Sequence, residues 1–340
     1  MTLTQQRWSR AELEELRKSK SLATGIHCPA CKKEKARVLR IGISENPDWP
    51  VYQCRHCRLQ FIEPCFDNVK EYYRTEYRKK HTDSYGHSSD NVEVQESAEQ
   101  RFAIQEWASK PSAKIFKEKV PAGTSVLEIG PSAGGFLSHL VGEYDLHAVE
   151  WNEDDARFVR EVGEIPCEEG EVADVFEGKT FGAIVARQVL EHTEDPWAFL
   201  ATCRKRLIGG GWLFLELPNA SNALCAVYGV REFQNWWYSA PHITYWEPET
   251  LANILDATGF EARVMPTQKF GLAHALYWIL RGEGMKHRNP AEGLKPVHPR
   301  HPLAPALNRI WSRMDKEYRV QMETLQGTDQ LRVVARRIEI

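Results

Sequence analysis

The stretch SVLEIGPSAGGFLSHLVGEYDLHAVE, residues Ser125–Glu150, decides the fold. An apolar run ends at Gly130, a turn of small residues follows, and a second apolar run ends at Glu150. This order is typical of a strand, a tight turn, a helix over 136–141 and a second, parallel strand. Ligands bind beyond the carboxyl ends of such strands, where glycine lets the backbone approach and an acid can hold a ribose. The stretch therefore predicts a nucleoside site.

The spacing of its acid and its glycines indicates which kind of nucleoside. A dinucleotide fingerprint, G-x-G-x-x-G, places a pyrophosphate on a helix N-terminus. Here the order is acid-x-Gly-x-x-x-Gly-Gly-aromatic. Glu128, at the end of the first strand, would repel a pyrophosphate and suits a cationic ligand without phosphate. A bare strand-turn-helix that binds no ligand is the alternative at this point.

With these residues the sequence resembles the class I S-adenosylmethionine-dependent methyltransferases. Residues 128–136 match their first motif, with Ser132 at the middle glycine position, and Glu150 matches their ribose-binding acid. The resemblance implies an α/β fold with a Rossmann-like seven-stranded sheet, whose last strand, 331–337, is antiparallel. It also implies S-adenosylmethionine contacts at the following positions: Glu128, Gly130, Pro131, Ser132, Gly134, Phe136, Glu150, Trp151, Glu171, Val172, Arg187 and Gln188.

The segment RQVLEHTEDP, residues 187–196, follows the predicted fourth strand and carries the candidate catalytic groups. It is similar to the V-L-E-H segment of many small-molecule methyltransferases, which implies that His192 lies beside the sulfonium. An imidazole titrates near neutral pH, so His192 is a candidate general base. His242 is a second candidate. Two other interpretations stay open: Glu191 and His192 brace the loop, or they hold a divalent ion together with Glu194.

Aromatic residues gather in two places where related enzymes contact their acceptors. One group precedes the core and the other lies in an insertion over 220–246. The resemblance implies that these side chains contact the acceptor, and plain packing is the alternative. The candidates are Tyr72, Tyr73, Tyr77, Trp237, Tyr238 and Tyr245.

Two C-x-x-C pairs, Cys28 with Cys31 and Cys54 with Cys57, stand twenty-two residues apart. Each pair forms a knuckle that turns two thiolates to one side, and two knuckles complete the tetrahedral set that zinc prefers. Four protein ligands leave no open position, so the predicted zinc is structural. The adjacent histidines, His27 and His56, are interpreted as bystanders, with replacement of one cysteine ligand by either of them as the alternative.

The composition is more typical of a soluble enzyme than of a nucleic-acid-binding protein. The chain has 340 residues, 42% of them hydrophobic, and a formal net charge of −3. A dedicated nucleic-acid binder usually carries a basic balance, so we expect no nucleic acid as partner. The polar first twenty residues and the short apolar stretch 270–280 predict a cytoplasmic protein without a membrane partner.

The predicted organisation has six parts. Residues 1–24 form a helix that begins with a capping box, 25–65 a zinc ribbon, and 66–118 a tyrosine-rich linker with helices. Residues 119–270 form the methyltransferase core, and 331–340 its last strand. Residues 271–330 form an inserted lid or an oligomerisation contact, which makes a homodimer a prediction, with Arg281, Lys286 and Arg288 as candidate phosphate contacts.

These observations predict an enzyme that methylates an oxygen of a small molecule with S-adenosylmethionine. A zinc ribbon joined to this core is similar to nucleotide-sugar methyltransferases, which makes a nucleotide-linked sugar or a secondary-metabolite intermediate the expected acceptor. Two alternatives stay open. One is a zinc-ribbon RNA base methyltransferase, and the other is a non-catalytic scaffold that binds S-adenosylmethionine.

Overall fold

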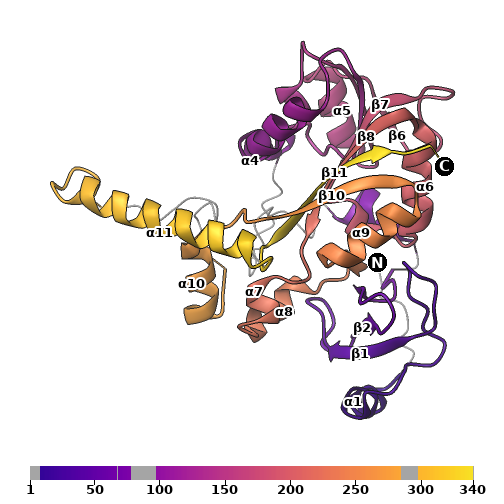
Figure 1. Ribbon diagram of the computed structural model, residues 1–340, viewed down its shortest axis with the longest axis vertical. Helices are drawn as coiled ribbons and strands as arrows, with labels where there is room; N and C mark the ends of the chain where they lie inside the picture. Colours follow the sequence, from indigo (N-terminus) through magenta and orange to yellow (C-terminus); the bar gives the residue numbers. More distant parts are fainter. Residues whose placement is uncertain (1–7, 67, 78–96, 285–297, 340) are drawn as a thin grey trace.

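A central sheet of seven strands organises the molecule, and its strand order is β10-β11-β8-β7-β4-β5-β6 (Figure 1). The computed structural model describes residues 8–66, 68–77, 97–284 and 298–339. The pairs β4–β5, β4–β7, β5–β6 and β7–β8 are parallel, whereas β11 is antiparallel to both β8 and β10. The predicted α/β sheet with an antiparallel last strand is therefore confirmed. Its strands are β4 (Ser125–Ile129), β5 (Asp145–Glu150), β6 (Cys167–Glu169), β7 (Phe181–Arg187), β8 (Leu207–Pro218), β10 (Phe260–Thr267) and β11 (Gln330–Arg337).

Both faces of the sheet are buried, which explains why its strands read as nearly continuous apolar runs. In β4, Val126 packs on the face covered by α4 (Ala98–Lys119) and α5 (Glu153–Glu161). Leu127 packs on the opposite face, below α6 (Pro196–Arg206) and α9 (Pro248–Ala257). Because successive side chains of a strand point to opposite faces, neighbouring residues of β4 belong to different hydrophobic layers.

The sequence predicts a helix over 136–141, and this prediction is wrong. The structure has a single 3-10 turn there, η2 (Leu137–His139). Gly134 and Gly142 bound the segment, both at positive φ, 83° and 80°. Glycines in this left-handed conformation interrupt a helical backbone on both sides of the turn. The long helix α4 covers this region instead, with the Phe116 ring 5.7 Å from the Phe136 ring.

The cysteine module has a small sheet of its own. Its strands are β1 (Ala36–Ile41), β2 (Pro50–Cys54) and β3 (Gln60–Phe61). Beside them lies α1 (Arg10–Ser19), which begins with the predicted capping box between Ser9 and Glu12. The fourth strand, β9 (Thr244–Tyr245), comes from the insertion and pairs with β3. Because of this pairing, the module and the insertion form one structural unit.

The two aromatic segments, one before the core and one in the insertion over 220–246, form short helices and helical turns. Residues 66–77 contain α2 (Val69–Glu71) and a π-helical turn, η1 (Tyr72–Glu76). The insertion contains α7 (Ala223–Ala226) and α8 (Arg231–Trp237). The rest of the predicted tyrosine-rich linker, 78–96, lies outside the described residues.

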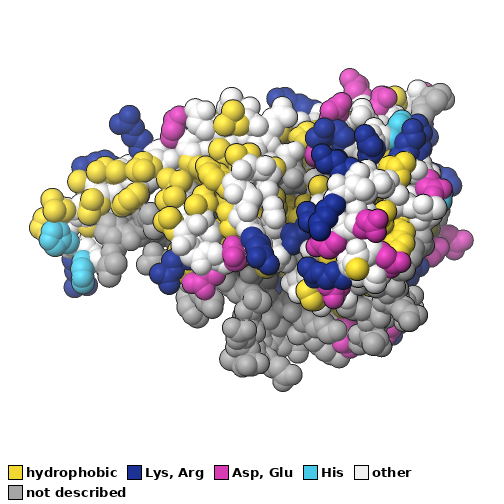
Figure 2. Space-filling model, turned by 90° about the horizontal axis from the view of Figure 1, so that it is seen from below, with side chains coloured by type: hydrophobic (Ala, Val, Ile, Leu, Met, Phe, Trp, Pro, Cys, Tyr) yellow, Lys and Arg dark blue, Asp and Glu magenta, His cyan; other side chains and the backbone are white. Residues whose placement is uncertain are grey.

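Two further helices follow β10, namely α10 (Leu272–Arg281) and α11 (Ala304–Thr324), and α11 extends away from the sheet (Figure 1). Its one buried residue is Ala304. Figure 2 shows hydrophobic side chains along this helix and the elements beside it. The exposed ones on or next to α11 include Leu303, Leu307, Ile310 and Met314. The lid or dimer role of 271–330 stays a prediction, and Lys286 and Arg288 lie outside the described residues. None of the helices in the described ranges has the length and apolar character needed to span a bilayer.

Candidate active site

The turn after β4 takes an unusual backbone course. Gly130, Ser132 and Gly134 have positive φ angles of 65°, 50° and 83°. A Cβ at Gly130 would lie 3.0 Å from Val189 Cγ2, so glycine allows the loop after β7 to come close. Ser132 is held in its left-handed conformation by its hydroxyl, which donates to Asp155 Oδ2 at 3.1 Å. The turn is a preformed cradle at the carboxyl end of the sheet.

Glu150 closes this cradle from the end of β5. Its carboxylate accepts hydrogen bonds from the backbone N–H groups of Ser132 (2.9 Å), Trp151 (2.8 Å) and Asn152 (3.0 Å). The carboxylate therefore joins the two turns that follow neighbouring strands. It lies half-buried at the position where a ribose is expected.

Two carboxyl groups lie in the interior without hydrogen-bond partners among the described residues. Glu128 is 1% exposed and its Oε2 has no partner. Burial raises its pKa to about 8, while the positive charge of Arg187 opposes this rise. Glu191 is also 1% exposed, neither of its carboxyl oxygens has a partner, and burial raises its pKa to about 8. A buried, unsatisfied carboxyl group is unfavourable, so both groups suit a site that receives a polar or cationic ligand.

Behind the cradle, one carboxylate holds two arginines. Glu216 receives Arg187 Nε at 2.8 Å and Arg332 Nε at 2.7 Å, and Ser112 Oγ donates to it at 2.6 Å. Burial alone would raise the pKa of Glu216, but the two arginines outweigh burial and bring it to about 2. Sequence reasoning missed Glu216, Arg332 and Ser112, because they come from β8, β11 and α4 and share no local motif.

His192 lies at the junction of three elements. It belongs to η3 (Leu190–His192), and its Nδ1 lies 2.5 Å from Tyr73 Oη and 2.9 Å from the carbonyl oxygen of Pro241. Tyr73 Oη also donates to that carbonyl oxygen at 3.0 Å. The rings of His192 and His242 are 4.8 Å apart. The structure thus brings together Tyr73 and both predicted base candidates.

Glu191 lies next to this pair of histidines. Glu191, His192 and His242 offer ligand atoms that all lie within 4.8 Å of one another. The sequence predicts a divalent-ion site of Glu191, His192 and Glu194, whereas the structure groups His242, and not Glu194, with the first two residues. His192 Nε2 lies 3.9 Å from Glu191 Oε1, too far for a direct hydrogen bond.

The predicted acceptor contacts fall into two sets. Tyr77 lies over the site, with its ring 6.2 Å from that of His192, and the Tyr73 ring lies 5.8 Å from that of Trp151. Tyr72 is buried and stacks on Phe66 at 3.8 Å. The other set is buried between the insertion and the cysteine module, in the cluster that holds Trp237, Tyr238 and Tyr245. Contact with an acceptor stays a prediction for all six.

Two remaining cofactor candidates follow β6. Val172 is buried, and Glu171 forms an ion pair with Lys70, whose Nζ lies 2.8 Å from Glu171 Oε1. This ion pair fastens the segment that contains the tyrosines to the edge of the core. Contact with an adenine stays a prediction for both residues.

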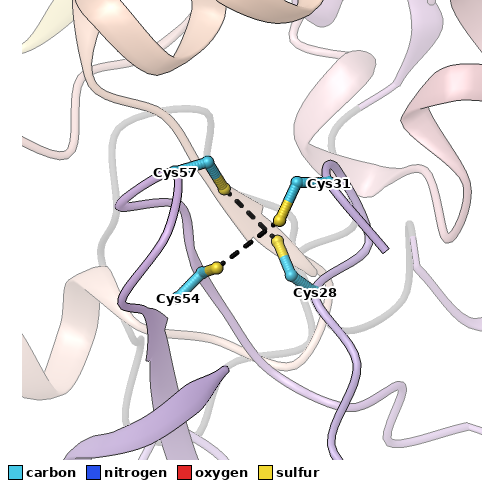
Figure 3. A group of neighbouring side chains, drawn as sticks. All are labelled: Cys28, Cys31, Cys54 and Cys57. Carbon is cyan, nitrogen blue, oxygen red and sulfur yellow. Dashed lines mark hydrogen bonds between the residues drawn. The ribbon is translucent and has the colours of Figure 1, made fainter. Parts of the chain in front are cut away.

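Figure 3 shows the four cysteines of the C-x-x-C pairs converging from two knuckles. Cys28 Sγ lies 3.5 Å from Cys57 Sγ, Cys31 Sγ lies 3.6 Å from Cys54 Sγ, and all four sulfur atoms lie within 4.8 Å of one another. Zinc–thiolate bonds of ~2.3 Å in a tetrahedron place sulfur atoms roughly 3.8 Å apart. The four-cysteine cluster therefore fits a zinc ion. His27 and His56 stand outside the cluster.

One protein-family model matches the middle of this chain. Residues 98–263 match the model of a family described as a methyltransferase domain. This part of the chain is therefore similar to a methyltransferase domain, which supports S-adenosylmethionine as the cofactor. A search of curated proteins with this chain gives no match.

Several solved structures are similar in fold. A SAM-dependent methyltransferase from Archaeoglobus fulgidus is 17% identical, with a TM-score of 0.47, and the match covers 70% of this chain and 97% of that one. A SAM-dependent methyltransferase from Thermotoga maritima, described as a possible histamine N-methyltransferase, is 16% identical, with a TM-score of 0.45 and coverage of 71% and 94%. A third, from Mesorhizobium loti, is 14% identical, with a TM-score of 0.42 and coverage of 68% and 98%. At such values none of these proteins indicates the acceptor.

Proposed function

We propose that the protein methylates a hydroxyl oxygen of a small molecule, with His192 as the general base. The observation that carries this proposal is the pair of oxygens at His192 Nδ1. The carbonyl oxygen of Pro241, 2.9 Å away, can only accept a hydrogen bond. It therefore favours the tautomer with its proton on Nδ1, which leaves the lone pair on Nε2.

The base acts through that Nε2 atom. S-adenosylmethionine, when bound, supplies an electrophilic methyl group. As the acceptor oxygen bonds to this methyl carbon and the carbon–sulfur bond breaks, His192 takes the hydroxyl proton on Nε2 and sulfur keeps the bonding electrons. Tyr73 and Pro241 position the imidazole during this transfer, because both contact Nδ1. Alignment of the acceptor and proton removal are the two contributions expected from the protein.

The cradle accounts for binding of the cofactor. Gly130, Ser132 and Gly134 bring the backbone close to a nucleoside, and Glu150 is placed to accept from ribose hydroxyls. Glu128 has an unsatisfied carboxyl oxygen in the interior, which suits a cationic ligand. These are the same residues that the sequence motif predicts.

We also propose that the four cysteines hold a structural zinc ion. The four sulfur atoms would fill a tetrahedral zinc site and leave no place for a substrate. The ion would hold together two knuckles that contact the core. Trp197 Nε1 donates to the carbonyl oxygen of Ala30, and Thr250 Oγ1 donates to that of Cys57 at 2.7 Å.

The test is methyl transfer from labelled S-adenosylmethionine to a panel of nucleotide-linked sugars and phenolic metabolites, followed by mass spectrometry. We expect a product that is heavier by one methylene group. The His192→Ala variant should lose a factor of about 10² to 10⁴ in rate, the usual contribution of a general base. His298→Ala, at an exposed position more than 100 residues after His192 in the sequence, is the matched control.

The activities of the histidine variants show whether the assignment of the general base or the proposed methyl transfer is at fault. If His192→Ala and His242→Ala both retain the wild-type rate, the assignment of the base is wrong even though methyl transfer stands. If neither oxygen nor any other atom of the panel is methylated and S-adenosylmethionine gives no binding heat, the proposed function itself fails.

A further inference from the structure

A groove of about 1030 Å³ lies beside the cofactor cradle, between α4 and the strands β8, β10 and β11. Arg187 and Gln188, which follow β7 and are predicted cofactor contacts, line one end of it. Helix α4 forms the opposite wall, and Arg319 of α11 contributes from the far end. The groove therefore reaches two of the residues that are predicted to contact the cofactor.

Seven of the residues that line this groove are lysines or arginines. Lys110 and Lys114 project from the α4 wall and Lys269 from the segment after β10, and none of the three forms an ion pair with a described residue. Two further lining cations are neutralised, since Lys117 pairs with Glu143 and Arg319 with Asp315. The acids that line the groove are Glu118 and Glu216. In a chain whose net charge is −3, this local excess of positive charge needs an explanation.

The floor of the groove carries more positive than negative charge. Arg187 and Arg332 share the single carboxylate of Glu216, so one positive charge remains. Asp329 lies nearby, but it accepts from the backbone N–H groups of Lys269 (2.8 Å) and Phe270 (2.6 Å) and from Gln268 Nε2 (3.0 Å). Burial lowers the pKa of Lys269, and the neighbouring Arg187 adds to this, while Glu216 and Asp329 oppose it. A bound anion would relieve the repulsion among these cations.

We propose that this groove binds the phosphate groups of a diphosphate-bearing acceptor. The inference rests on the proposed methyl transfer, because it places the anionic end of the acceptor in the groove and its reactive end at the cradle. Arg187 and Gln188 form the junction between the two sites. Lysine and arginine side chains on three sides of a groove suit several phosphate oxygens at once.

The dimensions and charges favour a small diphosphate over a polynucleotide. A volume of about 1030 Å³ is that of a small-ligand pocket. A polynucleotide site usually runs as a basic stripe across a surface and accompanies a basic net charge, whereas this chain has a net charge of −3. Glu118 at the rim also opposes a long polyanion.

The test is calorimetric titration of the full chain with inorganic pyrophosphate at low salt, in the presence of S-adenosylhomocysteine. We expect one binding site. Lys269→Gln and the double variant Lys110→Gln/Lys114→Gln should each weaken binding by about tenfold or more, as the loss of charge-assisted hydrogen bonds predicts. Lys205→Gln removes an equal charge from an exposed position on α6 and should leave binding unchanged. Thermal unfolding checks that each variant is folded.

The outcomes distinguish this inference from the proposed function. If S-adenosylhomocysteine binds and pyrophosphate does not, the groove assignment is overturned and methyl transfer stands. If pyrophosphate binds and the groove variants weaken it while S-adenosylhomocysteine shows no binding, the groove stands and the proposed function fails. If a single-stranded RNA 12-mer binds more tightly than pyrophosphate and the same variants abolish it, the occupant is nucleic acid and the inference is wrong.

Discussion

Glu128 is the residue that most directly links the fold to its ligand. Its carboxyl group is 1% exposed, and burial raises its pKa to about 8. Below this pH the free protein holds the group as the neutral acid. A cationic ligand favours the carboxylate instead, so binding and ionisation are coupled.

We therefore expect binding of S-adenosylmethionine at pH 7 to release a proton from Glu128, and the affinity to rise with pH until about pH 8. One pH unit changes the affinity by at most about tenfold. Calorimetry at pH 7 in two buffers of different ionisation enthalpy measures the released proton. The Glu128→Gln variant should bind more weakly and lose this buffer dependence, and an unchanged proton release in that variant would contradict the coupling.

Tyr73 tests the arrangement of the proposed base without removing it. Tyr73→Phe deletes the hydroxyl 2.5 Å from His192 Nδ1 but keeps the ring. We expect a shifted pH–rate profile and a fall in kcat larger than any change in KM, because the imidazole loses one of its two Nδ1 contacts. Tyr144→Phe, immediately before β5, removes a hydroxyl that donates to the carbonyl oxygen of Val120 and is the control. Equal effects of the two changes would mean that Tyr73 only packs.

At the scale of elements, helix α4 holds the cofactor turn in place. Arg101 of α4 bonds Asp155 of α5 through Nε at 3.1 Å, and both side chains are buried. The other carboxylate oxygen of Asp155 accepts from the hydroxyl of Ser132. One buried ion pair therefore joins two helices to the strained turn.

Removing the arginine should affect both stability and cofactor binding. Arg101→Met removes the guanidinium that faces the buried Asp155 carboxylate, which costs roughly 3 kcal/mol of the free energy of unfolding and loosens Ser132. Arg157→Met, which breaks an exposed pair with Asp154, should cost less than about 1 kcal/mol and leave binding unchanged. Denaturant unfolding and calorimetry measure the two effects. If the two variants are equally stable, the buried pair does not support the turn.

The cysteine module should be coupled to the insertion through β9. Strand β9 pairs with β3, and the two knuckles contact α6 and α9. We expect about one zinc ion per chain by elemental analysis. Chelation or Cys54→Ser should raise hydrogen exchange in residues 244–246 as well as in 25–65, and added zinc should reverse the effect of the chelator only. Exchange confined to 25–65 would show that the module is independent.

For the molecule as a whole, the buried acids set the dependence of stability on pH. Burial raises the pKa of Glu128 and Glu191 to about 8, above the value of 4.5 expected in the unfolded chain. Between these values the folded state holds more protons than the unfolded state, so stability falls as pH rises. The pKa of Glu216 is about 2, so its contribution is lost only as pH falls below about 4.5.

We therefore expect maximal stability near pH 4.5 and a loss of several kcal/mol, at most about 1.4 per pH unit for each of the two acids, between there and pH 8. Denaturant unfolding across this range measures it. The double variant Glu128→Gln/Glu191→Gln should flatten the alkaline side of the curve. A stability that rises from pH 6 to pH 9 would contradict the burial of these two acids in the neutral form.

The outcome of the sequence predictions depends on whether the relevant contacts are local. The parallel strands, the turn at Gly130 and the four-cysteine group all come from short motifs, and the structure has them. The pairing of β9 with β3 joins residues more than 180 positions apart, and no sequence pattern predicts it. The contact of Tyr73 with His192 likewise spans 119 positions.

The groove beside α4 was missed for the same reason. Its lysines read as the solvated face of a helix, and its arginines lie in strands that look ordinary in sequence. Only the sheet order brings Arg187 and Arg332 onto one carboxylate. Long-range pairing, rather than local propensity, creates this part of the molecule.

The central claim is that the crevice formed by Glu128, the Gly130–Gly134 turn and Glu150 holds the cofactor. A crystal structure of the protein soaked with S-adenosylhomocysteine tests it most directly. We predict density for the nucleoside in this crevice, with its ribose hydroxyls within hydrogen-bond distance of the Glu150 carboxylate. A fully occupied nucleoside elsewhere, or an empty crevice in crystals that withstand a saturating soak, would contradict the account.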